Sequence, residues 1–143
     1  MRQTQKNRAE RGSTMVESAL VLLTFFVMLI GTIDFGQVMF FHQSLVERAR
    51  TAVRYGVTDP TNTDGIKNMA VYNSVTVTGT PSAILPSLTK AMVNVQNPDA
   101  NTPSARVVVT ISGYPLNFFS PYITQSFSNL AVTVSMSSET QVP

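Results

Sequence analysis

The sequence predicts an α+β protein in which one long N-terminal helix packs on a small antiparallel sheet. Residues 11–55 contain no turn signal, and their first half is almost entirely apolar. Several later stretches alternate apolar and polar residues, the pattern of strands with one buried face. We therefore divide the chain into a cleavable basic leader at 1–12, a long helix at 13–56, and a β-rich exported domain at 57–143.

The leader holds most of the positive charge. The chain has 10 Lys and Arg and 8 Asp and Glu, of which residues 1–12 carry four basic and one acidic side chain. The remainder is close to neutral, so the basic balance does not indicate a nucleic-acid partner. A positive segment before an apolar run stays cytoplasmic, which sends the C-terminal domain across the membrane. We expect the polar leader itself to be disordered before processing.

The first half of the helix is expected to lie in the membrane. Residues 18–33 carry no charge, and Glu17 lies about 25 Å from Asp34 at ~1.5 Å rise per residue, close to a ~30 Å hydrocarbon core. Gly31, Asp34 and Gln37 form a small, polar strip that suits contact with another helix. Alternatively, Asp34 simply marks where the helix leaves the lipid. The sequence does not decide between these two interpretations.

The second half of the helix is amphipathic. Apolar side chains recur every three or four positions, which predicts a face covered by the exported domain. These positions are Val38, Phe41, Leu45, Ala49, Ala52 and Val53. Gly56 is expected to cap the helix C-terminus, before Pro60.

A polar loop follows the helix. Residues 62–65 resemble part of a calcium loop, but the first ligand position would fall on Pro60. We therefore interpret Thr63 or Asp64 as the N-cap of a short helix instead. That helix would carry Ile66, Met69, Ala70 and Asn73.

The rest of the chain is predicted to form strands. Alternation is clear at 75–78, 91–96, 107–111 and 130–136. Residues 113–129, between the last two, are rich in aromatics. These rings either cover the open edge of the sheet or contact a neighbouring subunit, and both interpretations stay open. The tail at 137–143 is expected to fray.

The sequence offers no catalytic constellation. His42 is the single histidine and the chain has no cysteine, so neither His/Cys catalysis nor a zinc site is supported. No Gly-x-x-x-x-Gly-Lys motif for a nucleotide phosphate is present. We predict no enzymatic activity, no metal and no cofactor.

The start of the helix carries the most specific pattern. Gly12 precedes Ser13, Glu17 stands at the fifth position after the glycine, and an unbroken apolar helix follows. This arrangement resembles the class III signal of type IV pilins and pseudopilins. Residues 17–22, 31–36 and 49–55 narrow the resemblance to the TadE-like family of tight-adherence pilus proteins, and 107–115 and 130–136 are similar to that family's closing strands. Ser18 departs from the aromatic that family members often carry there.

The resemblance implies a function. A prepilin peptidase would cleave the precursor after Gly12 and leave Ser13 at the new N-terminus. The trimmed subunit would sit in the bacterial inner membrane as a single-pass protein and enter a pilus through its helix. Partners would be other pilins and an assembly platform with a separate ATPase, and the family's members look like minor subunits.

The role of Glu17 has two interpretations. It pairs with the Ser13 ammonium of an adjacent helix when subunits assemble, or it serves peptidase recognition or stays at the lipid headgroups. Gly31, Asp34 and Gln37 are the other expected helix contacts. The competing function is an uncleaved membrane anchor with an exported β domain that binds a ligand, although an unpartnered Glu17 in such an anchor is costly. A membrane-anchored hydrolase lacks the residues to run it.

Overall fold

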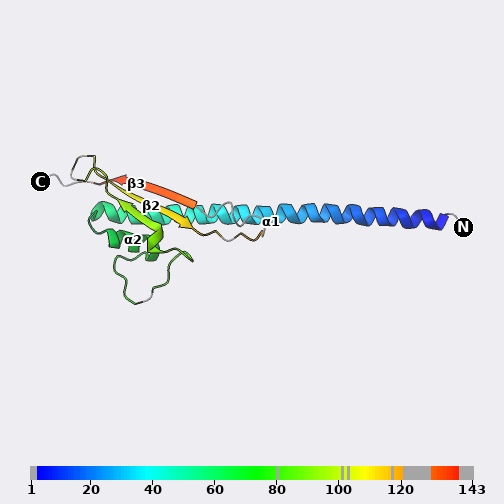
Figure 1. Cartoon of the computed structure of the whole chain (residues 1–143), viewed down its shortest axis with the longest axis horizontal. Helices are drawn as coiled ribbons and strands as arrows, with labels where there is room; N and C mark the ends of the chain where they lie inside the picture. Colours follow the sequence, from blue (N-terminus) through cyan, green and yellow to red (C-terminus); the bar gives the residue numbers. More distant parts are fainter. Residues whose placement is uncertain are drawn as a thin grey trace.

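The computed structural model describes residues 3–79, 81–100, 102, 104–116, 118–120 and 130–138. Its elements are α1 (Gln3–Thr58), α2 (Thr63–Tyr72), a short 3₁₀ helix η1 (Lys90–Met92), β1 (Val93–Gln96), β2 (Arg106–Tyr114) and β3 (Leu130–Ser137). The predicted fold class is confirmed, because a long apolar helix packs against a three-stranded antiparallel sheet in a pilin-like arrangement. Figure 1 shows the domain gathered around the C-terminal half of α1, while the N-terminal half extends far beyond it.

Helix α1 is longer than the sequence predicted. Its 56 residues correspond to about 84 Å at ~1.5 Å per residue. It begins at Gln3, so residues 3–12 are helical where disorder was expected. The physical reason is that extending a helix is far easier than nucleating one, and the first proline of the chain is Pro60.

Gly56 does not cap α1, contrary to the prediction. The helix continues to Thr58, and Gly56 is buried inside it. A Cβ at this position would lie 2.8 Å from Cγ1 of Val107 on β2 and 3.0 Å from Cδ1 of Ile66 on α2. Glycine is therefore required here for the close approach of three elements rather than for a turn.

Helix α2 is confirmed, but its cap was assigned to the wrong residue. The side chain of Asn62, rather than Thr63 or Asp64, accepts a hydrogen bond from the backbone N–H of Gly65 (2.9 Å). Asn62 also donates its amide to the hydroxyl of Tyr55 on α1 (3.1 Å). The cap therefore both starts α2 and ties it to the end of α1.

Three of the four predicted strands are present. The sheet order is β1-β2-β3 with both pairs antiparallel, and Val109 lies opposite Val95 on one side and Val134 on the other. Residues 75–78 form no strand, and residues 91–92 belong to η1. At 75–78 side chains take the carbonyls that a strand ladder would need, because Asn68 donates to the carbonyl of Val75 and Ser74 to that of Thr76.

The core lies between α1 and the inner face of the sheet, as the sequence predicted. Leu45 is fully buried on α1, and the ring of Phe41 lies 5.5 Å from that of Tyr114. The fully buried members of this core are Leu45, Ala49, Ala52 and Val53 of α1, Ile66, Ala70 and Val71 of α2, and Val107, Val109 and Ile111 of β2. The apolar stripe of the helix therefore carries the domain formed by α2 and the sheet.

Candidate functional site

The first part of the candidate site is the bare N-terminal half of α1. Every residue from 13 to 29 is exposed. The stretch Ser13–Thr58 is long and apolar enough to cross a membrane, and its most apolar window is not buried by the domain. Such a helix is consistent with membrane anchoring or export. In water an uncovered apolar surface of this length would be strongly unfavourable.

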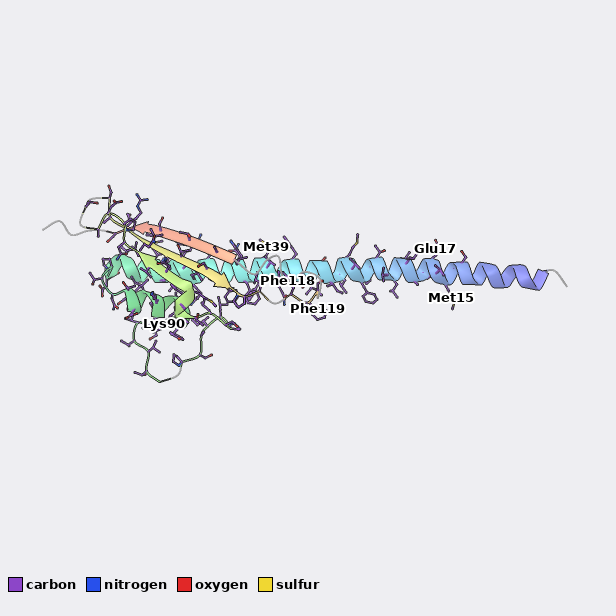
Figure 2. All side chains as sticks on the ribbon, in the orientation of Figure 1. Met15, Glu17, Met39, Lys90, Phe118 and Phe119 are labelled. Atoms are coloured by element: carbon purple, nitrogen blue, oxygen red, sulfur yellow. The ribbon has the colours of Figure 1, made fainter. Side chains whose placement is uncertain are left out.

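Glu17 lies on this bare segment. Figure 2 shows Glu17 and Met15 projecting from α1 far from the domain, and both side chains are exposed. Gly12, Ser13 and Glu17 lie within consecutive turns of one unbroken helix. Ser13 and Glu17 are four residues apart, so they occupy the same side of it.

The second part of the candidate site is Asp34, which the structure buries. Only 3% of its surface is exposed. Its Oδ1 accepts a hydrogen bond from the backbone N–H of Phe119 (2.8 Å), and its Oδ2 accepts one from the N–H of Ser120 (3.1 Å). Because both oxygens accept, the geometry suits an ionised carboxylate, and hydrogen bonds to a charged group are stronger than neutral ones. We call this arrangement the Asp34 clamp.

The structure places the three residues of the predicted polar strip in different environments. Asp34 is occupied within its own chain, whereas Gly31 and Gln37 are exposed on neighbouring turns of α1. A Cβ on Gly31 would meet nothing within 4 Å. Contacts of Glu17, Gly31 and Gln37 with another helix therefore stay predictions, and Asp34 has a partner that the sequence did not reveal.

The described part of the aromatic segment lies in two different environments. Tyr114 is almost fully buried and donates its hydroxyl to the carbonyl of Pro86 (2.8 Å). Burial also raises the pKa of the Tyr114 phenol above its ordinary value of 10.0. Phe118 packs partly against the core, whereas Phe119 is 71% exposed. Tyr122 and Phe127 lie outside the described residues.

The sequence contained a signal that Asp34 lies on the core-facing side of α1. The distances along the sequence from Asp34 to three buried or partly buried residues of α1 are 7 for Phe41, 11 for Leu45 and 18 for Ala52. Each distance is close to a whole number of helical turns at 3.6 residues per turn. Asp34 therefore continues the core-facing stripe toward the bare N-terminal half of α1. Its partners are backbone amides, which any residue supplies, so they had no signature of their own.

Two features of the described residues bear on catalytic or metal chemistry elsewhere in the domain. These residues contain no group of three or more His, Cys, Asp and Glu that could hold a metal. A cavity at the far end of the domain lies between Pro60, Asn97 and Ser138, and Arg106 is the single titratable side chain in its lining. A lone guanidinium provides no acid–base pair.

Comparison with known proteins agrees with the pattern on α1. Residues 12–54 match the TadE-like protein family, which is associated with Tad pilus assembly. The resemblance found in the sequence is therefore confirmed over this stretch, which starts at Gly12 and includes Glu17 and Asp34. The domain from 55 to 143 lies outside the match. No curated protein and no solved structure matched the chain.

Proposed function

We propose that this protein is a minor structural subunit of a tight-adherence, type IV-like pilus. It enters the inner membrane as a prepilin, loses its leader after Gly12, and assembles with other pilins through α1. The observation that carries this proposal is the family match over residues 12–54, which includes the bare residues 13–29 of α1. A bare apolar helix requires lipid or other helices around it.

Cleavage after Gly12 is the first step that can be tested. The glycine precedes a small residue, Ser13, and the basic leader ends there. Mass spectrometry of the membrane-extracted protein should show the loss of residues 1–12 when a matching prepilin peptidase is present. Retention of the leader under that condition would contradict a pilin role.

The role of Glu17 in assembly is the second step that can be tested. The domain covers neither Ser13 nor Glu17, since both are exposed. Cleavage would add an ammonium at Ser13, and a charge that leaves water needs an opposite charge beside it. We expect Glu17→Gln to be cleaved and inserted but to fail to enter the pilus or its priming complex. Ser18→Ala, one exposed position away, should assemble normally. Normal incorporation of Glu17→Gln would remove the pairing role, and loss of its cleavage would transfer Glu17 to peptidase recognition.

In addition to Glu17, Gly31 and Gln37 are proposed to contact neighbouring helices in the pilus. Both are exposed, and the open space at Gly31 permits a close approach by a neighbouring helix. Asp34 contributes to this helix contact indirectly, because its clamp holds the backbone at Phe119 against α1 near Gly31 and Gln37. Gly31→Leu should lower incorporation into the pilus while the unfolding midpoint of the domain stays unchanged.

The competing function is an uncleaved, single-pass binding module with an exported β domain. One observation favours it: α1 continues without a break through Gly12 to Gln3. The same intact mass separates the two functions. A full-length mature protein supports the binding module, and a protein that begins at Ser13 supports the pilin.

A further inference from the structure

We infer that the segment 118–120, held by Asp34, forms with the exposed side chains beside it an apolar collar that contacts the lipid of the outer leaflet and sets the depth of α1. We define the collar as Ile33, Phe35, Met39, Phe40 and Phe119. This inference goes beyond subunit assembly and rests only on the membrane insertion of α1, which is part of the proposed function.

The collar surrounds the helix over about two turns, since Ile33 and Phe40 lie ~10 Å apart along the axis. Phe35 and Met39 lie on one side of Asp34 around the helix, and Ile33 and Phe40 lie on the other, at ~100° per residue. Phe119 adds a ring from the loop, and it is 71% exposed, beside 67% for Phe35 and 63% for Phe40. Figure 2 shows Phe118 and Phe119 beside α1 where the bare helix meets the domain.

The Asp34 clamp removes the one charge that would interrupt this apolar surface. From residue 18 to residue 46, Asp34 is the only Asp, Glu, Lys or Arg. Asp34 is 3% exposed, and the N–H groups of Phe119 and Ser120 each donate to one of its carboxylate oxygens. The same bonds fix the backbone that carries the exposed Phe119 ring. One contact therefore hides a charge and presents an apolar side chain in its place.

The occupant of this surface is lipid because of where the collar lies. Glu17 and Asp34 are about 25 Å apart along α1, so a Glu17 at the inner boundary places the collar at the outer boundary of a ~30 Å hydrocarbon core. The collar also continues directly from the bare residues 13–29. Apolar side chains at that level bury themselves between the headgroups and the acyl chains.

A single fluorophore tests the depth of the collar. The chain has no tryptophan, so Phe119→Trp in the full chain, reconstituted in phosphatidylcholine vesicles, reports from one ring. We expect blue-shifted emission, strong quenching by lipids brominated near the glycerol end of the acyl chain, and little quenching by aqueous iodide. The matched control is Ala100→Trp, exposed at the far end of the domain, which should show the opposite quenching pattern.

The role of Asp34 is tested by combining Asp34→Asn with Phe119→Trp. The asparagine keeps the size of the side chain but offers one acceptor and places an NH₂ group against a backbone N–H. We expect quenching of the introduced indole by brominated lipid to fall at least ~3-fold relative to the Phe119→Trp protein. Amide hydrogen exchange in β2 should stay unchanged, which excludes global unfolding as the cause.

Three results would overturn this inference. Iodide quenching of the Phe119→Trp protein equal to that of Ala100→Trp would place the collar in water. Blue-shifted emission that brominated lipids leave unquenched would place the ring against protein, such as a second copy of the chain. Unchanged quenching in Asp34→Asn would remove Asp34 from positioning it. Because the vesicles require neither cleavage nor assembly, normal incorporation of Glu17→Gln would refute the pairing role and leave the collar standing.

Discussion

Replacing Gly56 with alanine should destabilise the domain, although alanine is the better helix former. The gain in helix propensity is about 0.8–1 kcal/mol. Against it, the new Cβ would lie 2.8 Å from Cγ1 of Val107 and 3.0 Å from Cδ1 of Ile66. Both partners are fully buried, and Val107 is stiff at χ1 because it is β-branched. Overpacking of this kind typically costs about 1–3 kcal/mol.

The net expectation for Gly56→Ala is a loss of up to about 2 kcal/mol in the free energy of unfolding. The matched control is Gly36→Ala on the same helix, where a Cβ would meet nothing within 4 Å and alanine should stabilise. Chemical denaturation of the full chain in detergent micelles measures both. If Gly56→Ala stabilises the protein as much as Gly36→Ala does, the new Cβ meets no steric cost and the glycine does not serve a close approach.

Three further changes test the core and the clamp. Leu45→Ala should lower the free energy of unfolding by about 2–5 kcal/mol, because Leu45 is fully buried, whereas His42→Ala, exposed one turn away, should change it by less than about 0.5 kcal/mol. Asp34→Ala should raise amide hydrogen exchange at Phe119 more than ~10-fold, since a hydrogen bond to a charged group contributes about 1.5–3 kcal/mol; unchanged exchange there would contradict the Asp34 clamp. Tyr114→Phe should cost about 0.5–1.5 kcal/mol near neutral pH through the lost hydroxyl bond. Because burial raises the folded-state pKa of Tyr114, the native state retains this proton longer, so the advantage of tyrosine over phenylalanine should shrink as the pH rises above about 10. Denaturation of both proteins at several alkaline pH values measures that trend.

The spacing of apolar residues predicted the structure correctly where burial alone decides it. The three-and-four spacing around Leu45 identified the face of α1 that carries the domain, since a helix presents those positions on one side. The alternation at 107–111 and 130–136 located β2 and β3, since successive side chains of a strand point to opposite faces of the sheet. At 75–78 an equally clear alternation was misleading. The pattern describes side chains, and it does not show that Asn68 and Ser74 occupy backbone carbonyls of that segment.

The errors at Gly56 and Asn62 share a tertiary origin. A glycine near a helix end suggests a cap by local rules, and only the docked β2 strand reveals that Val107 requires its missing Cβ. Several polar residues were possible caps for α2, and the contact of Asn62 with Tyr55 on α1 favours one of them. The partners of Asp34 were hidden more deeply, because backbone amides leave no mark in a sequence.

The Asp34 clamp also has a consequence for the order in which the chain folds. Asp34 is synthesised 85 residues before its first partner, Phe119, and closing so long a loop by itself costs about 4 kcal/mol of chain entropy or more. Packing of Tyr114 against Phe41 brings the two segments together beforehand, and only a short stretch of backbone then remains to be ordered. The clamp therefore closes after β2 has docked, and until that moment the Asp34 carboxylate keeps its water. Protection of the Phe119 amide during refolding should thus follow protection of β2 and never precede it.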